Sequence, residues 1–357
     1  MPATIRTGLI GYGFASKTFH APLIEAMPGL ELVAVSSSDA AKVHADRPTL
    51  TVLASPEELI ARPDIALVVI PTPNDTHFPL ARAALLAGKH VVVDKPFTLS
   101  VAQAQALSAL ATRQAVVLSV FHNRRWDGDF MTMRQLVQSG ELGRVVHFES
   151  HFDRFRPQLR CRWREQPGLG GGLWYDLGPH LIDQALQLFG WPQAINVDLA
   201  NLRDGAKTDD WCHAQLRYDG LRVSLHASAL VAACELRFAV HGTRGSYVKH
   251  GLDTQEDSLK AGALPCWPPQ PGWGTDAGYS MLTVLHEDQL VARAWPLQRG
   301  NYGAYYAELR DAIFGLAPNP VTPAQAIVVM ALIERGQQSA AQRRELPTPA
   351  LNDLTPG

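Results

Sequence analysis

Apolar runs alternate with amphipathic stretches along the first third of the chain. The runs are rich in β-branched residues and cover residues 5–10, 30–36, 65–70, 90–94 and 115–120. Continuous apolar runs are typical of strands that are buried on both faces of a parallel sheet. The intervening stretches predict helices, one after a glycine-rich turn, one from Pro79 to Ala87 and one capped by Ser100. This alternation predicts a doubly wound α/β domain over residues 1–121.

Beyond residue 121, apolar and polar positions alternate with period two. This alternation predicts a largely antiparallel sheet with one covered face, with strands at 194–202, 211–219, 221–230, 234–242 and 245–251. Helices are predicted at about 129–139, 302–315 and 323–340, and a long irregular loop, either a lid or an interface element, at 262–278. The pattern therefore predicts a second domain over residues 122–346 and a frayed tail over 347–357.

Composition and charge narrow the class of protein. The chain has 357 residues, which exceeds one ordinary core and agrees with two domains. A formal net charge of −2 without a basic run argues against nucleic acid or an anionic membrane as a partner. The four cysteines lack metal-ligand spacing and are expected to be reduced thiols, most of them buried. The first strand begins by Ile5 and no apolar run reaches membrane-spanning length, so a cytoplasmic protein is expected.

The strongest local signal is the stretch GLIGYGFAS at residues 8–16, between an apolar run and a helix. Small residues there let the backbone turn tightly and approach a pyrophosphate, which binds the N–H groups at the helix start. Ser16 takes the place of the usual third glycine or alanine. An ordinary turn is the alternative, but the surrounding alternation favours nucleotide binding. The predicted cofactor contacts in this turn are Gly11, Gly13, Phe14 and Ala15.

The end of the second strand predicts which dinucleotide binds. NAD-dependent proteins place an acidic residue here to bind the ribose 2′-OH. In this chain Ser36, Ser37 and Ser38 occupy these positions, and Lys42 follows. Serine hydroxyls can bind a 2′-phosphate without repelling it, so NADP is predicted. Asp39 is the competing residue and would favour NAD, and a polar turn without a ligand is the plain alternative.

Two further loops follow the third and fourth long strands, at the edge where open α/β sheets bind ligands. The first loop is expected to line the nicotinamide side of the site with Thr72, Pro73, Asn74 and His77. The second loop presents Lys95 directly before a proline. An ordinary loop with a helix cap, and an exposed surface lysine, are the respective alternatives.

The stretch WYDLGPHLIDQ at residues 174–184 places Asp176, His180 and Asp183 on one side of a predicted helix, together with Gln184 and Gln187. Leucine and alanine side chains occupy the other side. The polar residues are either an acid–base pair or the solvated face of an amphipathic helix, with Asp176 as its N-cap. The same spacing could ligate a metal for hydrolysis. That reading leaves the glycine turn and Lys95 unexplained, so no metal is predicted.

Arginines and aromatic residues are dense around the predicted domain junction. Residues 119–130 include Asn123 and Arg125, and residues 150–166 hold five arginines. Guanidinium groups could bind a polyhydroxylated or anionic ligand, or they could form interdomain ion pairs.

Taken together, GLIGYGFAS, TPNDTH, DKP and GGGLWYDLGPHLID resemble the Gfo/Idh/MocA family of NAD(P)-dependent oxidoreductases. The resemblance extends over nearly the whole chain. The stretches FHNRRWD, FDRFRP, RWRE, HGTRGSYVKHGLDTQED and NYGAYY look closest to its NADP-dependent scyllo-inositol dehydrogenase subgroup.

This resemblance implies an N-terminal Rossmann domain and a C-terminal α/β domain with a large, open, mostly antiparallel sheet. That sheet commonly packs on a partner subunit in the family, so a homodimer or homotetramer is expected. The family's Glu-Lys-Pro motif matches residues 94–96, with aspartate for glutamate, and its Asp-x-x-x-His motif matches Asp176 and His180. By this match, Lys95, Asp176 and His180 surround the reacting carbon. The expected substrate contacts are Asn123, Arg125, Trp163 and Tyr302, with Tyr305 as an alternative to Tyr302.

The chemistry of alcohol oxidation agrees with these residue types. Histidine accepts protons near neutral pH, so His180 is expected to act as general base, or as general acid in reduction. Lys95 would polarise the reacting oxygen, and Asp176 would orient a substrate hydroxyl. The sequence therefore predicts an NADP-dependent dehydrogenase acting on a CH–OH group of a cyclic polyol or sugar, similar to scyllo-inositol. A non-catalytic NAD(P)-binding regulatory protein is the alternative.

Overall fold

The computed structural model describes residues 4–160, 162–168, 170–233 and 236–354. The chain divides into two compact units, each of which combines segments that are distant in the sequence. The first unit comprises Met1–Trp126, Thr254–Trp273 and Asn301–Ile327, and the second comprises Asp127–Asp253, Gly274–Gly300 and Val328–Gly357. The predicted boundaries at residues 121 and 346 treat each domain as one continuous stretch of sequence. In the structure, each compact unit also includes segments from elsewhere in the chain.

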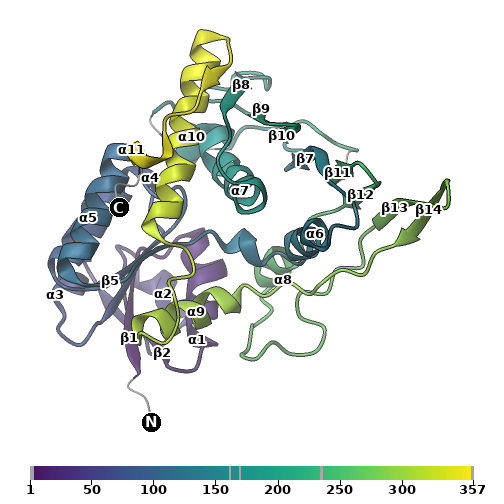
Figure 1. Cartoon of the computed structure of the whole chain (residues 1–357). Coiled ribbons are helices and arrows are strands. Elements are labelled where there is room, and N and C mark those ends of the chain that lie inside the picture. The colour runs from purple at the N-terminus through teal and green to yellow at the C-terminus, as the bar shows by residue number, and fades with distance from the viewer. Residues whose placement is uncertain (1–3, 161, 169, 234–235, 355–357) are drawn as a thin grey trace. The chain divides into compact units, whose positions relative to one another are not determined.

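The first unit contains a six-stranded parallel sheet in the order β3-β2-β1-β4-β5-β6 (Figure 1). Its strands are β1 (Ile5–Ile10), β2 (Leu30–Ser36), β3 (Thr51–Leu53), β4 (Leu67–Ile70), β5 (His90–Val93) and β6 (Leu118–Val120). All four side chains of β4 are buried, as expected for a strand covered on both faces. The predicted doubly wound sheet is confirmed. Only β3 escaped the sequence pattern, because it is short and partly exposed.

The first unit also contains helices, several of which connect these strands. They are η1 (Ser16–His20, π-helical), α1 (Ala21–Glu25), α2 (Ala40–Asp46), α3 (Pro56–Ala61), α4 (Asn74–Leu86), α5 (Val101–Gln114), the 3₁₀ turn η2 (Asn123–Trp126), α8 (Gln255–Lys260) and α9 (Gly303–Ile313). The predicted cap is confirmed, since the Ser100 Oγ accepts a hydrogen bond from the Gln103 N–H. The predicted start of α4 at Pro79 is wrong. The helix already begins at Asn74, and Pro79 lies exposed within it.

The second unit contains a nine-stranded sheet in the order β14-β13-β12-β11-β7-β10-β9-β8-β15, and most of these labels can be followed across Figure 1. Its strands are β7 (Val145–His151), β8 (Ala194–Ala200), β9 (Trp211–Tyr218), β10 (Leu221–Ser228), β11 (Leu236–Gly242), β12 (Gly245–His250), β13 (Ser280–His286), β14 (Gln289–Ala294) and β15 (Leu346–Pro347). One pair, β7 with β10, is parallel, and the other pairs are antiparallel. The predicted mostly antiparallel sheet is confirmed.

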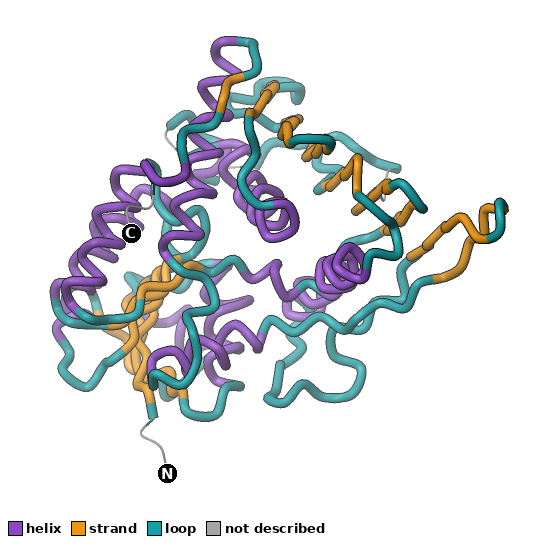
Figure 2. Tube along the Cα trace, viewed as in Figure 1, coloured by secondary structure: helices purple, strands orange, loops and turns teal. Residues whose placement is uncertain are grey.

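Two parts of this sheet differ from the sequence-based expectation. The β13–β14 hairpin, which extends away from the rest of the sheet in Figure 2, was not predicted. Its turn uses Glu287 and Asp288 at φ 47° and 64° rather than the glycine or asparagine that marks such turns. The prediction of a frayed tail is also wrong for residues 347–354, the part of the tail that the structure describes, whereas residues 355–357 lie outside the described residues. The Thr348 N–H donates to the Gln193 carbonyl at 3.0 Å, and the short helix α11 (Leu351–Leu354) follows.

Helices cover one face of the nine-stranded sheet. The helix α7 (Gly172–Phe189) packs against β9 and β10 and also contacts α6 (Gly128–Ser139). Alternate side chains of β9 are therefore buried, as the period-two pattern requires. The 3₁₀ turn η3 (Trp163–Glu165) precedes α7, and α10 (Pro323–Gln342) follows α9 in the sequence.

The structure bears on the predictions about the cysteines, the long irregular loop and membrane-spanning helices. Cys212 is buried and Cys266 is exposed, both as free thiols, whereas Cys161 and Cys234 lie outside the described residues. The predicted irregular loop is confirmed, since residues 262–278 contain no helix or strand. Within the described ranges, no helix has the length and apolarity needed to cross a bilayer.

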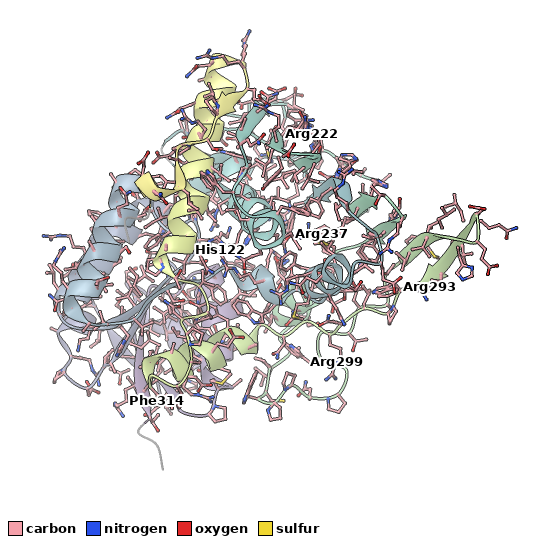
Figure 3. All side chains as sticks on the ribbon, viewed as in Figure 1. His122, Arg222, Arg237, Arg293, Arg299 and Phe314 are labelled. Carbon is pink, nitrogen blue, oxygen red and sulfur yellow. The ribbon has the colours of Figure 1, made fainter. Side chains whose placement is uncertain are left out.

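A buried guanidinium joins the sheet and helices of the second unit. Arg237 of β11, labelled in Figure 3, is 1% exposed. Its Nη2 donates to the Gln184 side chain of α7 at 2.7 Å, and its Nε lies 3.3 Å from the Asp129 carboxylate of α6. Its Nη1 donates to the Ser150 hydroxyl of β7 at 2.8 Å. One side chain therefore holds two strands and two helices in register.

We expect the substitution Arg237→Met to lower the free energy of unfolding by about 3–5 kcal/mol, because it leaves the Asp129 charge buried without its partner. Chemical denaturation of both proteins measures this loss. Arg222→Met on β10, two strands from β11 in the same sheet, is the matched control, because that side chain is exposed, and its effect should stay within about 0.5 kcal/mol. Equal losses in the two variants would contradict the proposed role of the network.

Candidate functional site

The glycine-rich turn of the first unit has the geometry that its sequence predicts. Gly11 has φ +81°, a region that favours glycine, and a Cβ there would lie 3.4 Å from the Thr72 methyl carbon. The Ser16 hydroxyl donates to the Gly11 carbonyl at 2.8 Å. The serine that replaces the usual small residue therefore closes the turn by its own hydrogen bond.

This turn forms one wall of a groove of about 500 Å³. The groove lies where β1, β2 and β4 end, beside the point at which the strand order reverses. It brings together most of the predicted cofactor contacts, namely Gly11, Gly13, Ser36, Ser37, Ser38, Thr72 and Pro73. Two others, Phe14 and Ala15, lie at the start of the following helix, where Phe14 is 57% exposed. The groove therefore has the position and the residues expected of a dinucleotide site.

At the serine-rich end of β2, the exposed Asp39 uses one of its carboxylate oxygens to cap a helix. Asp39 is the N-cap of α2, and its Oδ1 accepts a hydrogen bond from the Lys42 N–H at 2.9 Å. The Asp39 N–H in turn donates to the Ser37 hydroxyl at 3.1 Å. Ser38 and Lys42 are both exposed beside the groove. The carboxylate that competes for an NAD ribose is thus engaged in capping a helix.

His77 connects the two loops that follow β4 and β5. Its Nδ1 lies 2.8 Å from the Pro96 carbonyl oxygen and its Nε2 lies 3.0 Å from the Thr72 carbonyl oxygen. The ring is buried, and burial lowers its pKa. The neutral ring donates to one of these carbonyls. His77 thus ties the Thr72 loop to the loop of Lys95, whose bond to Pro96 is cis.

Asp94, directly before Lys95, belongs to a buried chain of polar groups. Its Oδ1 accepts the Lys95 N–H at 2.7 Å, and its Oδ2 lies 3.6 Å from the Nε2 of His20. The Nδ1 of His20 lies 2.6 Å from the Tyr306 hydroxyl. Burial raises the pKa of Asp94, but the hydrogen bond and charge of His20 and the charge of Lys95 outweigh it and hold the pKa at about 2. His20 and Tyr306 were not predicted, because nothing local links residues so far apart in sequence.

In the second unit, a run of glycines and a distant aspartate fix the start of α7. Gly172 has φ +88°, and a Cβ there would lie 2.0 Å from an oxygen of Asp209. The other carboxylate oxygen of Asp209 accepts the Trp174 N–H at 2.6 Å. Asp209 therefore caps the helix from outside it. The interpretation of Asp176 as N-cap is wrong, because the helix begins four residues earlier, at Gly172.

The polar side of α7 is more buried than its sequence suggests. His180 is 5% exposed, and its ring stacks on Phe152 with centroids 6.4 Å apart. Asp183 and Gln184 are also buried. The interpretation of this side as a solvated face is therefore wrong. Gln184 is a hydrogen-bond partner of the buried Arg237.

Asp176 lines a small pocket together with several arginines. The charged residues around this pocket are Arg154, Arg156, Arg162, Arg164, Arg203, Glu165, Asp176, Asp209 and Asp210. The Nε of Arg164 lies 3.4 Å from Asp176, and Arg162 and Arg203 contact Glu165 and Asp210 respectively. Burial and the charges of neighbouring arginines lower the pKa of Arg156 to about 10. These ion pairs all form within the second unit, and the excess of cations suits a ligand with hydroxyl or acidic groups.

The other predicted substrate contacts divide between the units. Asn123, Arg125 and Tyr302 belong to the first unit and Trp163 to the second. Arg125 donates to the Gln325 side chain at 3.0 Å, and Tyr302 is fully buried with its N–H bonded to Gln255. Trp163 is 36% exposed under the Arg164 guanidinium. The partners of Arg125 and Tyr302 give both residues a structural role in their own unit.

The distant cap of α7 predicts a pH dependence of stability. Burial raises the pKa of Asp209 to about 6, above its ordinary value of 3.8, although backbone hydrogen bonds oppose this. The protonated carboxyl thus favours the folded state below pH 3.8, and this contribution is lost as the pH rises through about 6. We expect the melting temperature of the wild type to fall relative to that of Asp209→Asn over this range. Asp204→Asn, which changes an exposed carboxylate nearby, is the control, and parallel curves for Asp209→Asn and wild type would refute the assignment.

Comparison with known proteins agrees with this architecture. Residues 5–122 match the family model "Oxidoreductase family, NAD-binding Rossmann fold", and residues 134–348 match "Oxidoreductase family, C-terminal alpha/beta domain". The chain is 58% identical to the uncharacterized oxidoreductase YdgJ of Escherichia coli, over 97% of this chain and 99% of that one. It is 35% identical to the scyllo-inositol 2-dehydrogenase (NADP(+)) IolW of Bacillus subtilis, over 96% of each.

Solved structures show the same fold. A Yersinia pestis protein superposes with a TM-score of 0.93 at 57% identity, covering 98% of this chain and 99% of that chain. An oxidoreductase from Bacillus cereus superposes with a TM-score of 0.87 at 31% identity, covering 97% and 99%. With both family models matched and relatives similar over their full length, the chain belongs to the Gfo/Idh/MocA family of oxidoreductases, with an NAD(P)-binding Rossmann domain and a C-terminal α/β domain.

Proposed function

We propose that the protein is an NADP-dependent dehydrogenase that interconverts a secondary alcohol and a ketone on a cyclic polyol or sugar similar to scyllo-inositol. The observation that carries the proposal is the groove of the first unit, where the glycine turn meets three serines and one oxygen of the competing Asp39 carboxylate caps a helix. The Bacillus subtilis relative, which is named as an NADP(+)-dependent scyllo-inositol 2-dehydrogenase, supports the same cofactor and substrate class.

The proposed chemistry assigns one task to each of three residues. Oxidation removes a proton from the substrate oxygen and a hydride from its carbon. The bound nicotinamide supplies the hydride chemistry. His180 takes the proton as general base, Lys95 stabilises negative charge that develops on the oxygen, and Asp176 orients a neighbouring hydroxyl. The pairing of Asp176 with Arg164 supports its carboxylate form.

The pocket beside Asp176 supports a substrate with many hydroxyls. Arginines donate hydrogen bonds in a fixed planar fork, which suits vicinal hydroxyls as well as carboxylates. A substrate screen should therefore contain neutral inososes and ketosugars together with sugar acids, each offered with NADPH and with NADH. Turnover of a member of this panel supports the proposal. Tight NADPH binding without turnover of any member would instead favour the alternative of a non-catalytic NAD(P)-binding regulator.

We expect His180→Ala and Lys95→Ala each to lower kcat by at least ~10²-fold, the usual size of acid–base and electrostatic contributions. Steady-state kinetics with the best substrate of the screen measures this loss. Gln187→Ala on the same helix is the matched control and should keep nearly the wild-type rate. A near-wild-type rate in either test variant would remove that residue from the proposed mechanism.

The cofactor preference can be tested at Ser38. A carboxylate at this exposed position would repel a 2′-phosphate and accept a hydrogen bond from a 2′-OH. We expect Ser38→Asp to lower the ratio of kcat/KM for NADPH to that for NADH by at least ~10-fold, the effect of one charge-assisted hydrogen bond. The control Ser38→Asn introduces a side chain of the same shape as aspartate but without its charge, and it should change this ratio far less. A wild-type preference for NADH would show that the serine argument is wrong.

A further inference from the structure

The face of the nine-stranded sheet that α7 leaves uncovered has a cluster of histidines and carboxylates. His226 of β10 lies in register with His151 of β7 on one side and with His213 of β9 on the other. Residues in such a row share one face of a sheet. Asp153 follows β7 and lies between the two strands, close to both His151 and His226. Neither the proposed chemistry nor the α7 pocket uses these side chains.

Three of these residues present ligand atoms to a common point. The Nδ1 of His151 lies 3.2 Å from one oxygen of Asp153, and the Nε2 of His226 lies 3.5 Å from the other oxygen. Ligand atoms from all three residues lie within 4.8 Å of one another. In a tetrahedral zinc site with bonds of about 2.0–2.1 Å, ligand atoms are about 3.3–3.4 Å apart. The separation of the His151 Nδ1 from one carboxylate oxygen matches an edge of such a site, and the His226 Nε2 lies at a similar distance from the second oxygen of the same carboxylate.

The surrounding groups orient the ligands as a metal site requires. The Nε2 of His151 lies 3.3 Å from the Glu149 carboxylate, which fixes the ring and leaves Nδ1 toward Asp153. A carboxylate behind a histidine is the usual support of a metal ligand. The ring of His226 is hydrogen bonded to the backbone of Cys212. Each imidazole therefore has a hydrogen-bond partner besides Asp153, and this partner fixes the orientation of the ring.

Asp153 supplies an independent indication of a missing ligand. Its side chain is 4% exposed, and its Oδ1 is a buried atom without a hydrogen-bond partner among the described residues. A buried carboxylate oxygen is costly unless a donor or a cation satisfies it. A cation between Asp153 and His226 would remove this cost.

We propose that His151, Asp153 and His226 bind a divalent transition-metal ion of the zinc class. Two imidazoles and one carboxylate are ligands that zinc and neighbouring metals favour over calcium or magnesium. Water or His213, whose ring centroid lies 5.7 Å from that of His226, completes the coordination. The ion joins β7 to β10, the one parallel pair of the sheet, and its role is structural. This proposal departs from the sequence-based expectation of no metal, because a local sequence window does not bring together residues of two separate strands.

Zinc titration of the chelator-treated full-length protein tests the proposal. Calorimetry should show one ion per chain with a dissociation constant in the micromolar range or tighter, and zinc should raise the melting temperature. His151→Asn and His226→Asn should each weaken binding by more than 10-fold, and Glu149→Gln by about 10–100-fold. Cobalt in place of zinc gives a visible spectrum that reports the coordination directly.

Two variants control for other sites. His241→Asn changes a histidine that is bonded to Ser246 on the next strand, and it should leave zinc binding unchanged. His180→Asn should also leave it unchanged, since α7 lies on the covered side of the sheet. Circular dichroism of each metal-free variant confirms its fold. The proposal is overturned if zinc does not bind saturably, if His151→Asn and His226→Asn bind as the wild type does, or if only His180→Asn abolishes binding.

Discussion

The burial of one positive charge sets the arrangement of the second unit. Arg237 sits under the sheet, and Asp129, Ser150 and Gln184 together meet its donors. A buried guanidinium tolerates little displacement of such partners, because each lost contact leaves a desolvated group. Gln184 lies one helical turn after His180, so the bond that satisfies the arginine also fixes the rotation of α7. The direction in which Asp176 and His180 point therefore depends on the position of Arg237, which lies on another element of the unit.

In the first unit, neutral side chains and paired charged side chains hold the loops of the site in position. His77 joins the loops after β4 and β5 through two backbone carbonyls, and His20 links Asp94 to Tyr306. The loop that presents Lys95 is thus held by buried side chains rather than by regular secondary structure. The buried residues that support a site therefore need positions as precise as those of the residues that line it.

The hydrophobic pattern predicted the two sheets, most strands and the position of the glycine turn, because strand burial and tight turns are encoded by nearby residues. It failed where a distant residue decides the outcome. Asp209 replaces the local N-cap that Asp176 was expected to be, and Arg237 turns a polar helix side into a buried one. Neither partner is visible from a window around α7. The motif order still identified Lys95, Asp176 and His180 as candidates, although their proposed roles rest on the family resemblance.

The nine-stranded sheet ends differently at its two sides. At one side, β15 is two residues long and includes Pro347, which has no N–H to offer a further strand. At the other side, β14 exposes all six of its residues, including Leu290 and Val291, while Arg293, labelled in Figure 3, adds charge. Exposed backbone groups of an edge strand are templates for pairing with another chain, and charge opposes this. A strand from another chain can therefore extend the sheet at the β14 edge but not at the β15 edge.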